Sequence, residues 1–101
     1  MTEAIFHILL SLRDGPRDAE AILAQMRALA PNVKPPALAS FYRALKKASA
    51  KRYLAVTRIA ESGARGRPRQ LYRITRSGRT ALEAEARRLE RLAMAALEAR
   101  K

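Results

Sequence analysis

The stretch Pro36-Ala37-Leu38-Ala39-Ser40-Phe41-Tyr42-Arg43-Ala44-Leu45-Lys46-Lys47-Ala48 decides the fold of this chain. Placed on a helix at about 100° per residue, its apolar residues fall on one side, at the spacing of a stripe that faces a core. That stripe consists of Leu38, Phe41, Tyr42, Leu45 and Ala48. The opposite side carries Pro36, Ser40, Arg43 and Lys47, with Lys46 and Lys51 on its flanks. The pattern predicts a helix over about 36–50 that anchors in a core and offers a positive ridge to a negatively charged partner.

The charge balance also indicates a polyanionic partner. The chain has 101 residues, which suits one small domain, and its 21 Lys and Arg against 9 Asp and Glu give a formal net charge of +12. Such an excess favours DNA, RNA or an anionic membrane surface. There is no cysteine, and His7 is the one histidine, so disulfides, thiolate zinc sites and histidine clusters within one chain are excluded. We expect no metal and no cofactor.

Several classes of protein are disfavoured. The sequence has no Gly-rich phosphate loop, no histidine–carboxylate pairing and no plausible nucleophile site, so we do not expect an enzyme. It begins Met1-Thr2-Glu3, unlike a secretion signal, and no apolar run is long enough to span a bilayer. We therefore expect a cytoplasmic protein with no membrane partner.

Two further helices are predicted before the opening stretch. The first, over 2–13, has Thr2 as its cap and an apolar stripe. The second, over 18–30, begins at Asp18. Their stripes are Ile5, Ile8, Leu9 and Leu12, and Ala19, Ile22, Leu23, Met26 and Leu29. Because the link 31–34 is short, the second and third helices are expected to form a helix-turn-helix.

After these helices the hydrophobic period changes. The segments 54–59 and 70–75 are β-branched or alternating, as strands are, and the Gly- and Pro-containing segment 60–69 between them predicts a hairpin with a long tip. The tip carries Arg65, Arg67 and Arg69. Arginines in a surface loop are placed to contact a partner.

The C-terminal segment is predicted to be one long helix, capped by Thr75 or Ser77 and running to about residue 100. Its apolar residues recur at heptad spacing between charges of both signs: Leu82, Ala86, Leu89, Leu92, Ala93, Ala96 and Leu97. Roughly 25 residues at 1.5 Å each make a helix too long for so small a body to cover. We therefore expect a dimerisation helix, the alternative being a helix that folds back on its own core.

Together these elements predict an α+β, mostly α fold: a winged helix-turn-helix of three helices and a β-hairpin wing, with a long C-terminal dimerisation helix. The expected division is 1–76 for the DNA-binding domain and 77–101 for the dimerisation helix.

Three motifs in this order resemble the PadR family of transcriptional regulators. Residues 2–17 are similar to the family's first helix with its Gly-Pro stop, and residues 40–47 to its recognition helix. Residues 66–75, with Gly78-Arg79, resemble its wing and the start of its final helix. The resemblance implies a DNA-binding transcription regulator. Some members bind aromatic compounds between subunits; with no Trp and five aromatic residues here, a small-molecule effector is possible but not indicated.

The predicted DNA-binding residues divide by chemistry. Arg43 is the best candidate for reading a base, since its planar fork can hold two acceptors of guanine. Ser40 and Tyr42 are expected to hold phosphates through their hydroxyls, although Tyr42 could instead lie in the core. The lysines expected to neutralise backbone charge are Lys34, Lys46, Lys47 and Lys51. The hairpin-tip arginines are expected to reach the minor groove or flanking phosphates.

The sequence thus predicts a sequence-specific double-stranded DNA-binding regulator, expected to be a repressor, that binds a palindromic operator as a homodimer. Two alternatives remain open. One is a general nucleic-acid-binding winged helix, nucleoid- or RNA-associated. The other is a winged helix whose basic face binds an acidic protein.

Overall fold

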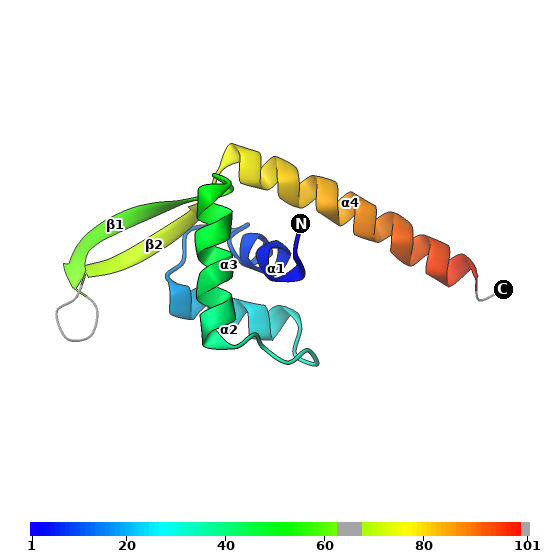
Figure 1. The fold of residues 1–101 in the computed structure, drawn as a ribbon, viewed down its shortest axis with the longest axis horizontal. Helices are drawn as coiled ribbons and strands as arrows, with labels where there is room; N and C mark the ends of the chain where they lie inside the picture. Colours follow the sequence, from blue (N-terminus) through cyan, green and yellow to red (C-terminus); the bar gives the residue numbers. More distant parts are fainter. Residues whose placement is uncertain (63–67, 100–101) are drawn as a thin grey trace.

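The computed structural model describes residues 1–62 and 68–99. The elements, in chain order, are α1 (Glu3–Ser11), α2 (Ala19–Leu29), α3 (Leu38–Ala50), β1 (Leu54–Ser62), β2 (Pro68–Ile74) and α4 (Arg76–Glu98). Figure 1 shows the first three helices gathered into one body, with the hairpin projecting from one side and α4 leaving on the other. The molecule is therefore elongated, at 58 × 28 × 22 Å. The predicted winged helix-turn-helix with a long C-terminal helix is confirmed.

Of the four helices in the described part of the chain, three begin where a side chain caps them. Thr2, Asp18 and Thr75 each accept a hydrogen bond from the backbone N–H three residues later, at 3.2, 2.8 and 3.0 Å respectively. Of the two predicted caps for α4, Thr75 is therefore the one used. The fourth helix, α3, begins at Leu38 after Ala37, which offers no capping side chain, so it starts later than predicted.

One apolar core lies where α1, α2 and α3 meet the base of the hairpin. The predicted α1 stripe is confirmed, since none of its four residues is more than 2% exposed. The core residues are Ile5, Ile8, Leu9, Leu12, Ile22, Met26, Phe41, Ala44, Leu45, Ala48, Leu54, Ile74 and Leu82. In α2 the prediction was wrong for the last residue of the stripe, because Leu29 is 37% exposed near the helix end.

The buried side of α3 differs from the predicted stripe. Leu38 and Tyr42 were expected to face the core, but they are 60% and 48% exposed. The residues that face inward instead are Phe41, Ala44, Leu45 and Ala48. Two of these are alanines, whose small side chains let α3 approach its neighbours closely. At 100° per residue, the helix is turned by roughly 50° from the predicted orientation.

The hairpin is tied to the helical body through its second strand. β1 and β2 pair antiparallel, with Leu54 opposite Ile74 and Ser62 opposite Pro68, and the register shifts between Arg58 and Ser62. Both strands extend beyond the predicted segments toward the tip. Arg17, just before α2, exchanges two backbone hydrogen bonds of 3.0 and 2.9 Å with Tyr72 of β2. This added bridge fixes the angle between the wing and the helices.

The start of α4 is locked against the turn that follows α3. Arg52 has a positive φ of 63°, and its carbonyl oxygen accepts hydrogen bonds from Thr75 Oγ1 at 2.6 Å and Ser77 Oγ at 2.9 Å. A Cβ on Gly78 would lie 1.9 Å from the carbonyl oxygen of Tyr53. Only glycine permits this approach, so the direction in which α4 leaves the body is set here.

Beyond its first turns α4 leaves the core. Its main packing partner within the chain is α1, and Leu82 is its one large side chain in the core. Among the described residues, no helix is long and apolar enough to cross a membrane.

Candidate nucleic-acid interface

The exposed side of α3, here called the outward face, is cationic and lacks acids. Its residues are Leu38, Ala39, Tyr42, Arg43, Lys46, Lys47 and Ala50. Lys34 and Lys51 are exposed at the two ends of the helix. The structure thus brings together six of the ten predicted DNA-binding residues as exposed side chains, and a seventh, Ser40, is partly exposed at the margin. The centre of the face runs through Tyr42, Arg43 and Lys46 rather than along the predicted line Ser40–Arg43–Lys47.

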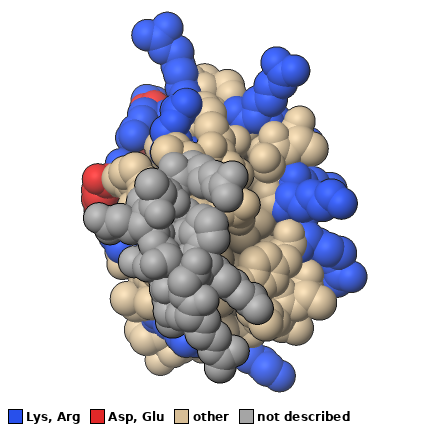
Figure 2. All heavy atoms as spheres, turned by 90° about the vertical axis from the view of Figure 1, so that its left-hand side faces the viewer, with Lys and Arg blue, Asp and Glu red and all other residues tan. Residues whose placement is uncertain are grey.

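The remaining predicted residues belong to the hairpin. Arg65 and Arg67 lie outside the described residues, and Arg69 is part of β2. Figure 2 views the molecule from the hairpin side: Lys and Arg side chains project around this face, and few Asp or Glu are visible.

Ser40 positions Arg43. The guanidinium Nη2 of Arg43 donates a hydrogen bond of 3.2 Å to Ser40 Oγ, one turn earlier on α3. This contact uses one of five N–H donors and restrains a long side chain, leaving the rest of the fork for two acceptors on one partner group. In this structure Ser40 therefore helps to hold the Arg43 side chain in position.

A shallow cleft separates α3 from the wing. It is lined by Tyr42, Leu45, Lys46, Ser49, Ala50, Val56 and Tyr72. The Tyr42 ring stacks edge-on against Phe41, with centroids 5.3 Å apart, so an aromatic from the core braces an aromatic on the surface. The residues that line the cleft thus include one cation, Lys46, and two phenols, Tyr42 and Tyr72.

Tyr72 is a functional candidate that sequence reasoning did not single out. It lies on β2 across the cleft from Tyr42, and its hydroxyl is 3.4 Å from Gln70 Oε1. Partial burial, and secondarily the neighbouring Tyr42, raise the pKa of Tyr72 above its ordinary value of 10.0. Both causes favour the neutral phenol, which can donate a hydrogen bond. Strand alternation predicts which side of the hairpin carries Tyr72. Whether that side faces α3 depends on the angle between the hairpin and the helices, which the sequence does not give.

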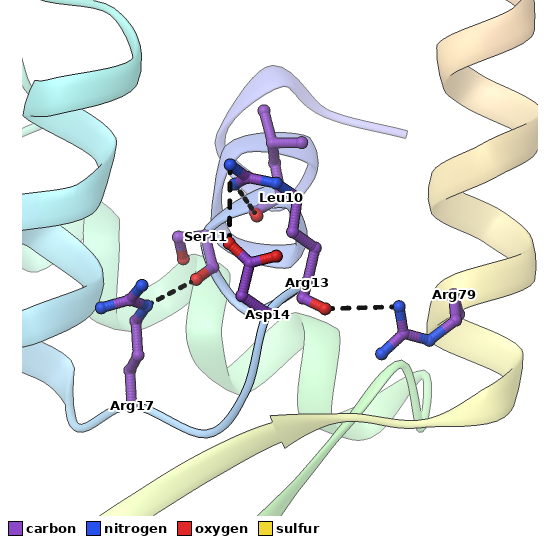
Figure 3. A network of polar contacts seen from close by, with 6 residues as sticks. All are labelled: Leu10, Ser11, Arg13, Asp14, Arg17 and Arg79. Carbon is purple, nitrogen blue, oxygen red and sulfur yellow. Dashed lines mark hydrogen bonds and ion pairs between the residues drawn. The ribbon is translucent and has the colours of Figure 1, made fainter.

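Not all of the basic residues are free for a partner. Figure 3 shows Arg13, Arg17 and Arg79 around the C-terminal end of α1. Arg13 Nη1 and Arg17 Nε donate to carbonyl oxygens of α1 at 2.8 Å each, and Arg79 Nη1 donates to the Arg13 carbonyl at 3.4 Å. The Leu10 carbonyl also accepts the backbone N–H of Arg13 at 3.3 Å. The three cations thus add hydrogen bonds at the end of α1 and in the turn after it, where positive charge is also favourable. They belong to the scaffold.

The predicted dimerisation residues separate into two groups. Leu82 is only 7% exposed and packs into the core of its own chain. The others are uncovered in the single chain: Ala86, Leu89, Leu92, Ala93, Ala96 and Leu97. Three of these are large apolar side chains 38–56% exposed, which is costly unless a partner covers them. Met94, which was not among the predicted residues, is also 55% exposed, on another side of α4.

His7 has no ligand set around it. Its Nε2 lies 3.8 Å from Glu3 Oε1, one turn earlier on α1. Within the described part of the chain, no group of His, Asp and Glu could hold a metal ion.

Comparison with known families gives a match over most of the chain. A profile described as "Transcriptional regulator PadR-like family" matches residues 8–84. A comparison with curated proteins gave no match.

Solved structures share the fold. A PadR family transcription regulator from hypervirulent Clostridium difficile R20291 is similar at a TM-score of 0.82 and 18% identity, covering 96% of this chain and 97% of its own. Bacillus subtilis PadR in complex with operator DNA is similar at 0.73 and 20% identity, covering 85% of this chain and 46% of its own. Bordetella bronchiseptica BpsR, whose DNA binding is regulated by 6-hydroxynicotinic acid, is similar at 0.70 and 21% identity, covering 94% of this chain and 60% of its own. At these identities the likeness concerns the fold.

Proposed function

The chain belongs to the PadR-like family of transcriptional regulators, and we propose that it binds a palindromic operator as a homodimer and represses the promoter that it occupies. The single observation that carries this proposal is the outward face of α3. It is an exposed helical face with three cations and no acid, flanked by a wing. The operator complex of the Bacillus subtilis relative supports the same use of this fold.

In the proposed complex, α3 enters the major groove, which is wide enough for one helix. Arg43, restrained by Ser40, reads a guanine through two acceptors. Lys46 and Lys47 lie on either side of it and neutralise phosphates, as do Lys34 and Lys51 at the helix ends.

The cleft between α3 and the wing is proposed to receive one sugar–phosphate strand. The hydroxyls of Tyr42 and Tyr72 and the ammonium of Lys46 are suitable donors for phosphate oxygens. Val56, which is 46% exposed, offers apolar contact to the sugars. The arginines of the hairpin tip then follow toward the minor groove, as the sequence predicts.

The second half of α4 is proposed to pair with the same helix of another protomer. Its uncovered apolar residues continue at heptad spacing from Leu82 and need a second chain. The proposal keeps the division into a DNA-binding domain over 1–76 and a dimerisation helix over 77–101, whose residue Leu82 packs against the core of the DNA-binding domain. Two recognition helices held by such a dimer can meet half-sites about 34 Å apart on one face of the duplex.

The test is binding of the purified chain to its own upstream DNA, with random duplex as competitor, at two salt concentrations. We expect tighter binding to the upstream DNA than to the random duplex at both concentrations. Equal affinity for the two duplexes would favour the general nucleic-acid-binding alternative. Binding to neither, with retention on an acidic protein, would favour the second alternative.

A small-molecule effector is a second candidate function, favoured by a cavity of about 360 Å³ between α1, α2 and the turn before α3. That volume is in the range of ligand sites. The cavity is lined by apolar side chains, among them Leu23, Met26 and Val33. Its ionisable lining residues are His7, Arg27 and Lys34 and one acid, Glu3, which lies beside His7, so Arg27 and Lys34 are the cations left for a ligand. A small aromatic carboxylate would suit it, and such a compound regulates DNA binding by the relative BpsR.

This candidate is tested with 6-hydroxynicotinic acid as probe and nicotinamide as its uncharged control. Release of DNA, followed by fluorescence anisotropy, should occur with the acid and be lost in Arg27→Ala. Release that is unaffected by Arg27→Ala, or absent with both compounds, would exclude this cavity as a carboxylate site.

A further inference from the structure

We propose that Leu38 and Ala39, in the first turn of α3, recognise thymine in the operator through its 5-methyl group. The inference rests on the proposed function and adds the chemistry of a second base contact beside that of Arg43.

The exposure of Leu38 is the first observation. The other leucine of α3, Leu45, is 3% exposed and belongs to the core, whereas Leu38 is 60% exposed. Leu38 is outside the core cluster and outside the partly buried residues that pack against it. The fold therefore does not need this side chain, and a large aliphatic group stands in water at the edge of a cationic face.

Its position on the helix is the second observation. In helix-turn-helix proteins, the N-terminal residues of the recognition helix contact base edges. Ala39, Arg43 and Lys46 follow one another at i, i+4 and i+7, so they form one row along the middle of the outward face. Leu38 precedes Tyr42 by one turn on the neighbouring row. The pair thus continues the proposed reading surface toward the N-terminal end of α3.

The chemistry of the two side chains selects the partner group. Neither can donate or accept a hydrogen bond, so neither can recognise a phosphate or the polar edge of guanine, cytosine or adenine. The one apolar feature that the major groove presents is the C5-methyl of thymine. Ala39 is small enough to let the helix approach a base closely, and Leu38 adds the contact area that covers the methyl group.

The experiment removes that methyl group from the DNA and leaves the protein intact. Duplexes enriched by the full chain from a random pool are resynthesised with deoxyuridine in place of each thymine, one position at a time. We expect one or two positions in each half-site to lose about fourfold in affinity, which is the effect of one methylene-sized apolar group. All other thymines should tolerate the change.

Protein variants then identify the residue that contacts the methyl group. Leu38→Ala and Ala39→Ser should bind the thymine duplex more weakly, and should no longer distinguish thymine from uracil at the sensitive positions. Ala84→Ser is the matched control, because Ala84 is exposed on α4 and lies outside the outward face and the cleft. It should keep the full preference for thymine. Circular dichroism and thermal unfolding are compared for all variants.

The outcomes separate this inference from the proposed function. If the pool is enriched for a sequence but uracil is tolerated at every position, the inference is wrong and the proposed function stands. If uracil weakens binding equally in wild type and in both variants, another residue reads the methyl group and the inference is also wrong. If no sequence is enriched, both are overturned.

Discussion

Single residues show how one type of charge serves two purposes. Arg13, Arg17 and Arg79 donate to carbonyl oxygens at the end of α1, where they stabilise the fold. Arg43 is bonded only to a hydroxyl on its own helix, and the lysines of the outward face have no ion pair among the described residues. The net charge of the sequence therefore overstates the charge available to a partner.

Substitutions of Arg43 and Lys46 are expected to weaken DNA binding in different ways. Arg43→Ala should cost about 1–3 kcal/mol on the specific duplex and relax the preference at one base position, because a bidentate base contact is lost. Lys46→Ala should weaken all sequences alike and reduce the magnitude of the salt slope by about 1.8 for the proposed dimer, because one phosphate contact is lost in each protomer. Titrations of specific and random duplex at several salt concentrations measure both. An equal loss on both duplexes for Arg43→Ala would remove it as a reader.

Gly78 is expected to be intolerant of any side chain. Gly78→Ala places a methyl group on the backbone carbonyl of Tyr53, so either α4 or the turn after α3 must shift. We expect a loss of about 3 kcal/mol in the free energy of unfolding, at the upper end for overpacking by one methyl group. Urea denaturation measures it, with Thr80→Ala, at an exposed position of the same helix, as the control. Equal stability of the two variants would contradict the packing described.

The ion pair between Glu85 and Arg88 predicts a pH dependence. Two hydrogen bonds of 2.9 and 2.7 Å from the Arg88 guanidinium lower the pKa of Glu85 below its ordinary value of 4.5. Because the folded pKa is the lower one, the stabilisation is present above the ordinary value and is lost as pH falls through the folded value. Carboxyl shifts by NMR should show the pKa of Glu85 rising in Arg88→Gln. It should not change in Arg87→Gln, and an unchanged pKa in both variants would argue against the pair.

At the scale of elements, the orientation of α3 decides which residues a partner meets. Hydrophobic periodicity predicted the helix itself and three of its core residues, Phe41, Leu45 and Ala48. It placed Leu38 and Tyr42 on the buried side of the helix, but both are exposed. Periodicity takes account of side-chain polarity alone, and not of the space that neighbouring elements leave for a side chain. Ala44 and Ala48 contribute little to a hydrophobic pattern, but their small side chains let α3 pack closely against its neighbours on this side.

The free half of α4 supplies the prediction for assembly. Leu92→Glu with Leu97→Glu should leave the winged helix folded and give a monomer, because charges are placed in the proposed seam. Met94→Glu is the matched control: Met94 is as exposed as these leucines, but at 100° per residue it lies roughly 120° from the middle of the stripe. Sedimentation at micromolar concentration distinguishes the species. Dimers in the double variant, or a monomeric wild type, would refute the seam.

At the scale of the whole molecule, the cationic surface and the exposed apolar stripe of α4 lie apart along the long axis. The body and wing carry the cationic side, while α4 extends away with an apolar stripe between mixed charges. The family match makes the chain a transcription regulator, which confirms the prediction that it is not an enzyme. The DNA-binding residues and the dimer stay predictions.

Salt dependence is the whole-molecule prediction. If the exposed lysines of α3 and its ends act in both halves of a dimer, the slope of log affinity against log salt should lie between about −4 and −7. The larger magnitude corresponds to Lys34, Lys46, Lys47 and Lys51 each neutralising one phosphate in both protomers. Anisotropy titrations from low to physiological salt provide the measurement. A nearly flat response would be incompatible with a site dominated by phosphates.

By itself, the sequence determined the element order, the caps at Thr2 and Asp18, the α1 stripe and the basic character of the third helix. These depend on local backbone chemistry and on periodicity, which neighbouring residues along the chain fully specify. Only the tertiary structure decided the rotation of α3, the position of Tyr72 across the cleft, and the use of Leu82 inside its own core. Each of these depends on how closely segments far apart in the sequence can approach, and that distance is set by the volumes of all the side chains packed between them.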